Sequence, residues 1–284
     1  MTIEQNNPTG SFTMVPKRIH PKFIGVVHLP ALPGDVYGTQ SFSACYEYAL
    51  QDAKALIDGG AEGIIIENFG SAPFHKGTQA DPAPPHQIAA LTVVAQQIRQ
   101  LSTEVQLGIN CLRNDAYAAL GIASAVQADF IRVNVLSGAY VTDQGLIEGE
   151  AARILRYRQQ LGAENIKIFA DILVKHAAPL APLTAEQAAL DTWKRGGADV
   201  LIVSGTGTGA PVSKELLQQV QQAVQGKVAV YLGSGLTLHN MNELAPLASG
   251  AIVGTALKEG CILSAPVSVK SVKAMSEKLK PYWT

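Results

Sequence analysis

The sequence predicts a single (β/α)8 barrel, a TIM barrel, with a phosphate-type pocket on the face where the strands end. Three observations predict it. Short aliphatic runs alternate with longer helical stretches eight times along the 284 residues. The runs are nearly continuous in apolar residues, which is typical of strands covered on both faces. Gly-Gly-Ala turns end two of the helical stretches, at 59–61 and 196–198, where a left-handed residue lets the chain return to a strand.

Each expected strand is rich in Val, Ile, Leu and Phe, the residues that pack well in buried sheets. The eight are Phe23–Leu29, Gly63–Phe69, Val105–Cys111, Phe130–Leu136, Ile166–Val174, Asp199–Gly205, Val228–Leu232 and Gly250–Leu257.

A helix is expected after each strand. Two of the helices carry a capping signal, Thr184 with Gln187 three residues on, and Ser213. The expected helices are Tyr46–Asp58, Gln87–Leu101, Asp115–Gln127, Glu148–Leu161, Ala185–Arg195, Lys214–Val224, a short helix from Asn240, and Val269–Leu279.

No break in composition divides these units, so we expect one barrel domain over residues 23–284. Residues 1–22 are polar and lack the apolar centre of a secretory signal, which predicts a flexible leader. An open, doubly wound sheet is the alternative fold, but eight regular units without a switch point favour closure.

Composition narrows the classes of partner. The chain has 22 basic and 23 acidic residues and no basic block, which argues against nucleic acid. Its three cysteines are far apart, as in proteins of a reducing compartment, and no run is long and apolar enough to span a bilayer. We therefore expect a cytoplasmic protein. The histidines lack HExxH-like spacing, so neither a metal nor a cofactor is predicted.

Polar residues gather where the predicted strands end, which is where TIM barrels carry reacting groups. Candidate catalytic residues are Asp171, Glu67, Arg132, Asn134 and His28, and candidate substrate contacts are Asn68 and Asn110.

Some of these candidates have two interpretations. Asp171 fits both a catalytic base and a buried partner of Arg132 on the neighbouring strand. Glu67 and Asn68 are adjacent, so in a regular strand only one of them points inward. Lys175 follows the fifth strand, and it would form an imine only in a desolvated site.

Two loops predict the anion site. Gly233-Ser234-Gly235 follows the seventh strand and Gly254-Thr255 follows the eighth, and small residues there let backbone N–H groups approach a phosphate. A third glycine-rich loop begins at Gly205-Thr206 and fits either a ligand wrap or a simple turn. Two long loops, 28–38 and 70–86, fit lids or surface ornaments, and the latter carries Phe74.

Nine long and unusual segments are spread along nearly the whole chain, from about Phe23 to Leu279. They are HLPALPG (28–34), ENFGSAPF (67–74), GINCLRND (108–115), FIRVNV (130–135), TDQGLIEG (142–149), DILVKHA (171–177), LIVSGTGTG (201–209), LGSGLT (232–237) and AIVGTALKEG (251–260). With these segments the chain resembles the BtpA family, named for a photosystem I biogenesis protein. One departure from the family pattern is Ser71, where an acidic residue is expected before Pro-Phe.

The resemblance implies a role in the accumulation of photosystem I proteins, with peripheral attachment at the cytoplasmic face of the thylakoid membrane. The family also extends to organisms without photosynthesis, so the resemblance equally implies a second function, an enzyme of lyase, isomerase or nucleosidase-type hydrolase class acting on a phosphorylated sugar or nucleoside. The polar rim and the anion loops fit this second function. The sequence leaves both functions open, and with them the question of catalysis and of a homo-oligomer.

Overall fold

Eight parallel strands close into a barrel in the structure, a computed structural model that describes residues 20–205, 207 and 209–283. This confirms the predicted fold class. Around the barrel the order is β1, β2, β3, β4, β7, β9, β10 and β11, closing back onto β1. These strands span Phe23–His28, Gly63–Glu67, Gln106–Asn110, Phe130–Val133, Lys167–Ile172, Val200–Val203, Ala229–Leu232 and Gly250–Val253.

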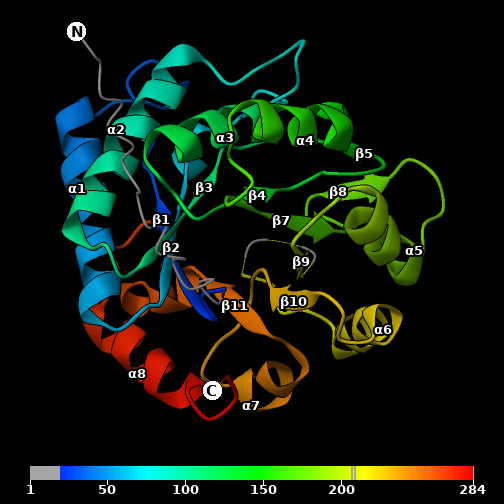
Figure 1. The fold of residues 1–284 in the computed structure, drawn as a ribbon. Coiled ribbons are helices and arrows are strands. Elements are labelled where there is room, and N and C mark those ends of the chain that lie inside the picture. Colours follow the sequence, from blue (N-terminus) through cyan, green and yellow to red (C-terminus); the bar gives the residue numbers. More distant parts are fainter. Residues whose placement is uncertain (1–19, 206, 208, 284) are drawn as a thin grey trace, which may run out of the picture.

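Helices surround the strands (Figure 1), with α1 and α2 on one side of the barrel and α5 and α6 on the other. Both predicted caps are confirmed, since the hydroxyl of Thr184 accepts from the Gln187 N–H and that of Ser213 from the Leu216 N–H. The helices are α1 Phe42–Asp58, α2 Pro85–Leu101, α3 Ala116–Ala125, α4 Ala151–Gln160, α5 Ala185–Leu190, α6 Lys214–Val224, α7 Met241–Leu244 and α8 Val269–Leu279.

Two apolar layers explain why the strands read as continuous hydrophobic runs. Residues such as Ile24 and Phe130 form a cluster inside the barrel, where Phe130 stacks on Phe169. Their neighbours in sequence, such as Val27 and Ile131, pack outward in the cluster beneath the helices. Each strand is therefore buried on both faces, as parallel strands usually are.

Residues 1–19 of the predicted leader, 1–22, lie outside the described residues. The three described residues pack onto the barrel. The His20 ring meets Phe169 edge to face at 5.5 Å, and Lys22 donates from Nζ to the Trp283 carbonyl at 2.9 Å.

A small sheet interrupts the regular alternation after β4. Strands β5 (Ala139–Thr142), β6 (Gly145–Glu148) and β8 (Ala177–Pro179) pair antiparallel in the order β6-β5-β8. The sequence expectation of a helix from Glu148 was wrong at its start, because Glu148 ends β6 and α4 begins at Ala151. The last barrel strand is likewise shorter than expected, since 3-10 turns replace it from Thr255.

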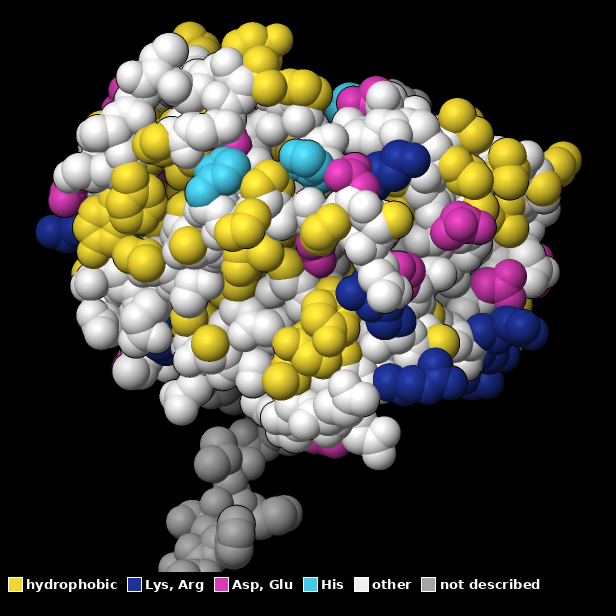
Figure 2. Space-filling model, turned by 90° about the horizontal axis from the view of Figure 1, so that it is seen from above, with side chains coloured by type: hydrophobic (Ala, Val, Ile, Leu, Met, Phe, Trp, Pro, Cys, Tyr) yellow, Lys and Arg dark blue, Asp and Glu magenta, His cyan; other side chains and the backbone are white. Residues whose placement is uncertain are grey.

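On the face shown in Figure 2, hydrophobic side chains lie in several separate groups with charged side chains between them. Across the described part of the chain, every helix is too short or too polar to cross a bilayer.

Candidate functional site

The carboxyl ends of the barrel strands surround a cavity of about 420 Å³. Five of its charged or amide lining residues were candidates from the sequence or were weighed there: Glu67, Asn110, Arg132, Asn134 and Lys175. They come from β2, β3, β4 and the segments that follow β4 and β7. Parallel strands bring these ends to one rim, so residues distant in sequence share one pocket.

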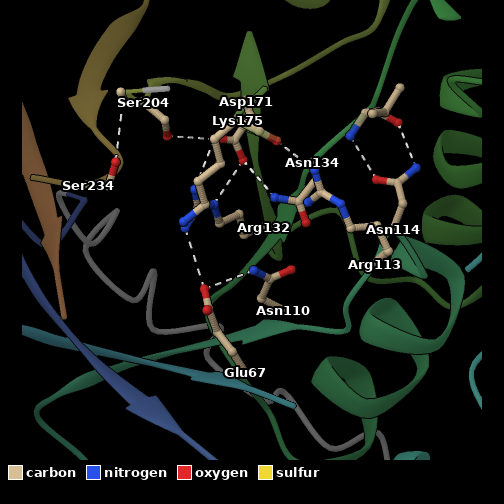
Figure 3. Close-up of polar contacts among 12 residues, drawn as sticks. Glu67, Asn110, Arg113, Asn114, Arg132, Asn134, Asp171, Lys175, Ser204 and Ser234 are labelled. Atoms are coloured by element: carbon tan, nitrogen blue, oxygen red, sulfur yellow. Dashed lines mark hydrogen bonds and ion pairs between the residues drawn. The ribbon is translucent and has the colours of Figure 1, made fainter. Parts of the chain in front are cut away.

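Arg132 and Asp171 form a buried ion pair at the base of this cavity (Figure 3). Both oxygens of Asp171 are fully used. Oδ1 accepts from Arg132 Nη2 at 2.9 Å and from Ser204 Oγ at 3.1 Å. Oδ2 accepts from Arg132 Nε at 2.9 Å and from Asn134 Nδ2 at 3.1 Å. Asp171 does not line the cavity, so of its two interpretations the geometry favours the structural partner.

Glu67 is the carboxylate that reaches the cavity. Its Oε1 accepts from Asn110 Nδ2 at 2.9 Å and from Arg132 Nη1 at 3.4 Å. Burial would raise the pKa of Glu67, but the positive charge of Arg132, helped by His28, Lys175 and the Asn110 amide, holds it below its usual value. Glu67 is therefore ionised at neutral pH, and both contacts fall on Oε1, which leaves Oε2 for a ligand.

Asn110 and Asn134 have their orientations fixed by these carboxylates. A carboxylate only accepts, so each amide must turn its NH2 group toward Glu67 or Asp171. The carbonyl Oδ1 of each asparagine is then the free end. Both Oδ1 atoms are buried, and no hydrogen-bond donor among residues 20–205, 207 and 209–283 reaches them. The site therefore presents two acceptors that match a ligand rich in hydroxyl or amino groups.

Asn68 points the other way, as the alternation of a strand requires. Its amide is fully buried, donating to Gln87 Oε1 at 2.9 Å and to the Leu112 carbonyl at 3.1 Å, and accepting from the Leu112 N–H at 2.7 Å. These bonds tie the loop after β3 to α2. The position of Asn68 suits a residue that shapes the site from behind rather than one that contacts substrate.

A second cavity of about 190 Å³ adjoins the first, and Glu67, Arg132 and Lys175 line both. The predicted anion loops lie here, since Gly233–Gly235 and Gly254–Thr255 are in its lining. The N–H groups of Ser234, Gly235 and Thr255 make no hydrogen bond to the described part of the chain.

Two of the predicted anion-site residues already use their N–H groups. Gly233 donates to the Val203 carbonyl at 2.8 Å, and Gly205 donates to Ser234 Oγ at 3.3 Å. Gly205 therefore supports the loop rather than lining the cavity. Thr206 lies outside the described residues.

Gly235 needs to be glycine for two reasons. Its φ is +71°, and an added Cβ would lie 2.1 Å from the Ala210 carbonyl oxygen. This close approach packs the 233–235 loop against Ala210 and Pro211 and holds the second cavity in shape.

His28 lies in the lining of the second cavity, against Gly254. Burial lowers the pKa of His28 to about 4, with Lys258, Lys175 and Arg132 acting in the same direction against the opposing charge of Glu67. The imidazole is therefore neutral at neutral pH. Its ring meets Phe69 edge to face at 4.9 Å, and its buried Nδ1 has no partner among the described residues.

Arg113, Asp143 and His176 also line the first cavity, and the sequence pattern did not single them out as site residues. Arg113 follows β3 within the segment GINCLRND, whose position after a strand was the available signal. Asp143 lies in the turn between β5 and β6, and no sequence pattern predicted this turn. Phe74, from the expected lid, lines the same cavity. Within the described ranges, no three His, Cys, Asp or Glu side chains group as metal ligands would.

Fold and site together define a TIM barrel with a charged, concave pocket at the carboxyl ends of its strands. A family model described as the BtpA family matches residues 19–281, and the chain belongs to this family.

Two relatives and one solved structure show how far the likeness extends. The chain is 45% identical over 265 residues to Photosystem I biogenesis protein BtpA of Synechocystis sp., covering 92% of this chain and 90% of that protein. It is 44% identical over 257 residues to an uncharacterised protein of Thermococcus kodakarensis, covering 90% and 94%. Thiamine phosphate pyrophosphorylase from Pyrococcus furiosus matches in fold, with a TM-score of 0.56, 16% identity and coverage of 92% and 97%.

Proposed function

We propose that this protein is an enzyme that binds a phosphorylated sugar or nucleoside across the two cavities. The observation that carries the proposal is that Glu67, Arg132 and Lys175 line both cavities, which makes them neighbouring parts of one site. A ligand with one anionic end and one hydroxyl-rich end fits this division. The close relative in an archaeon supports a role for the barrel that does not depend on photosynthesis.

The phosphate is placed in the smaller cavity. The backbone N–H groups of Ser234, Gly235 and Thr255 are available there. Such N–H groups bind a phosphate as neutral hydrogen-bond donors. The hydroxyl groups of the ligand lie in the larger cavity, where they donate to Oδ1 of Asn110 and Asn134. These bonds satisfy two acceptors whose burial without a partner costs about 1–3 kcal/mol each.

Glu67 is the general base in this proposal. It is ionised, reaches the cavity and keeps Oε2 free, whereas Asp171 has all its lone pairs engaged. Arg132 stabilises negative charge that develops on the substrate, and Asp171 is a positioning residue that fixes the plane of its guanidinium. The aromatic rings of Phe69 and Phe74 in the lining exclude water from the reacting end.

The test is a set of sugar phosphates and nucleoside 5′-monophosphates incubated with the protein in D2O and followed by NMR. We expect at least one member to incorporate deuterium or form product. Glu67→Gln should slow that change by about 100-fold or more, the usual contribution of a general base. Glu277→Gln, on the exposed face of α8, is the matched control and should retain the full rate.

Two outcomes would overturn the proposal. One is that no phosphorylated member changes although the protein is folded. The other is that Glu67→Gln and Glu277→Gln turn over the same compound at the same rate, which would place the chemistry elsewhere.

A second candidate function is photosystem I biogenesis at a membrane surface, carried by the 45% identity to the Synechocystis protein of that name. In this proposal the barrel attaches peripherally at the cytoplasmic face of the thylakoid membrane. The cationic side chains proposed for this contact are four exposed lysines on or just after α8: Lys270, Lys273, Lys278 and Lys280.

The membrane proposal predicts that purified protein sediments with cyanobacterial thylakoids at low salt. It should be released at about 1 M salt, where the screening length falls to ~3 Å. Changing the four lysines to glutamate should abolish sedimentation. Protein that stays in the supernatant at low salt would contradict this second function and leave the first untouched.

A further inference from the structure

Lys175 differs from Glu67 and Arg132, which line the same two cavities, because its side chain has no ion-pair partner among the described residues. It lies three residues beyond β7 in the lining of both cavities. Its backbone is held by Arg113, which donates from Nη2 to the Lys175 carbonyl at 2.8 Å. Its Nζ has no hydrogen bond or ion pair to any residue in 20–205, 207 or 209–283.

The surroundings of Lys175 disfavour its protonated form. Burial lowers the pKa of Lys175, and Arg132 and Arg113 lower it further against the opposing pull of Glu67 and Asp171. The neutral amine, which is the nucleophilic form of a lysine, is therefore more populated than in an exposed lysine. Lys258 is a useful contrast: it is fully buried, whereas Lys175 is half-buried, and its Nζ contacts Asp52 at 2.5 Å, as expected for a structural ion pair.

Lys175 also has the right neighbours for carbonyl chemistry. Glu67 lines the same two cavities and can accept or return a proton. The free Oδ1 atoms of Asn110 and Asn134 border the larger cavity and can accept from a hydroxyl or an N–H. The anion loops line the smaller cavity, and Lys175 lines that cavity with them.

We propose that Lys175 forms an imine with the carbonyl carbon of the substrate, which makes that substrate a phosphorylated aldehyde or ketone. This inference rests on the proposed function. The Nζ lone pair attacks the carbonyl carbon. The carbinolamine oxygen takes one proton from the attacking nitrogen and a second from solvent, and it leaves as water. The iminium then accepts the electron pair released when an adjacent C–H bond breaks, or an adjacent C–C bond whose far carbon carries a hydroxyl. Glu67 takes the proton from that carbon or that hydroxyl, which leaves an enamine. The enamine carbon regains a proton from Glu67, and water hydrolyses the resulting iminium to the carbonyl product and the free amine, with one proton returned to solvent.

The experiment uses pyridoxal 5′-phosphate as a phosphorylated aldehyde probe, with pyridoxal as the matched probe that lacks the phosphate. The protein is treated with each probe, reduced with borohydride to fix any imine, digested and analysed by mass spectrometry. Lys270, exposed on α8, is the internal reference. Labelling of Lys175 should exceed that of Lys270, because Lys175 lines both cavities and its surroundings disfavour its protonated form.

Two further results are expected. Inorganic phosphate should suppress the labelling of Lys175 by pyridoxal 5′-phosphate but not that of Lys270. Lys175→Arg should lose the label at this position while still binding inorganic phosphate in a 31P NMR titration.

Labelling of Lys175 no faster than Lys270 would overturn the imine proposal. If inorganic phosphate still binds in that case, the proposed function stands without it. If Lys175 is labelled equally by both probes and phosphate does not compete, the imine chemistry stands and the phosphate site of the proposed function fails.

Discussion

Arg132 donates two parallel hydrogen bonds to Asp171, from Nε to Oδ2 and from Nη2 to Oδ1, each 2.9 Å long. The pair is almost completely buried, with 3% of the Arg132 side chain and none of the Asp171 side chain exposed. Arg132 reaches Glu67 with its remaining nitrogen, Nη1, at 3.4 Å. The pair therefore connects the base of the barrel mouth to the carboxylate that faces the ligand.

Removing Asp171 should destabilise the protein strongly. Asp171→Ala leaves the Arg132 guanidinium buried with a weaker partner, and breaking a buried pair from one side costs about 3–5 kcal/mol. The measurement is the free energy of unfolding from urea denaturation. The matched control is Glu243→Gln, which breaks the exposed pair with Lys214 at 3.4 Å and should cost less than about 1 kcal/mol. Equal costs for the two variants would contradict the structural role of Asp171.

Stability should fall as the pH drops from 6.5 toward 4, because the pKa of His28 is lowered to about 4. In this window the unfolded chain binds a proton at His28 and the folded chain does not, so acid favours unfolding, by at most about 1.4 kcal/mol per pH unit. His176, whose pKa burial also lowers, acts in the same direction.

His28→Gln should flatten this part of the profile, and His239→Gln, at an exposed position, should leave it unchanged. The measurement is unfolding free energy against pH. A His28→Gln protein with the wild-type slope between pH 6.5 and 5 would show that His28 is not held neutral.

Gly235→Ala should lower the free energy of unfolding by more than the backbone penalty of the left-handed region alone. Gly226 offers a matched control, since its φ of +68° is close to the +71° of Gly235 but an added Cβ there meets nothing within 4 Å. Gly226→Ala should cost about 1–2 kcal/mol, the usual penalty of the left-handed region. Gly235→Ala should cost clearly more because of the clash with Ala210, and it should also weaken inorganic phosphate binding in a 31P NMR titration. Equal losses of stability and unchanged phosphate binding would contradict the packing of the two loops.

The barrel could be predicted because its signal repeats. Eight aliphatic runs at regular spacing overdetermine the fold, so an error of a few residues at one end, as at Thr255, does not change it. The β5–β6–β8 sheet could not be predicted, because its strands have only three or four residues and two of them contain Gly145 or Pro179. Its pairing depends on tertiary contact rather than on local pattern.

The same distinction between local pattern and tertiary contact applies to the residues of the candidate site. Strand position predicted that Glu67, Asn110, Arg132 and Asn134 would meet at one rim. Sequence could not decide whether Asp171 faces the ligand or Arg132, because that depends on which side chains surround it in space. Arg113 and Asp143 were missed because they come from loops whose path is fixed by the rest of the fold.

The most direct measurement is a crystal structure of the protein with ribose 5-phosphate, a probe with one phosphate and several hydroxyl groups. We predict the phosphate at the N–H groups of Ser234, Gly235 and Thr255, at about 3 Å, and sugar hydroxyls at the same distance from Oδ1 of Asn110 and Asn134. A sugar phosphate bound outside both cavities, or one whose phosphate lies beside Asn110 with its hydroxyls at the glycine loops, would contradict the account.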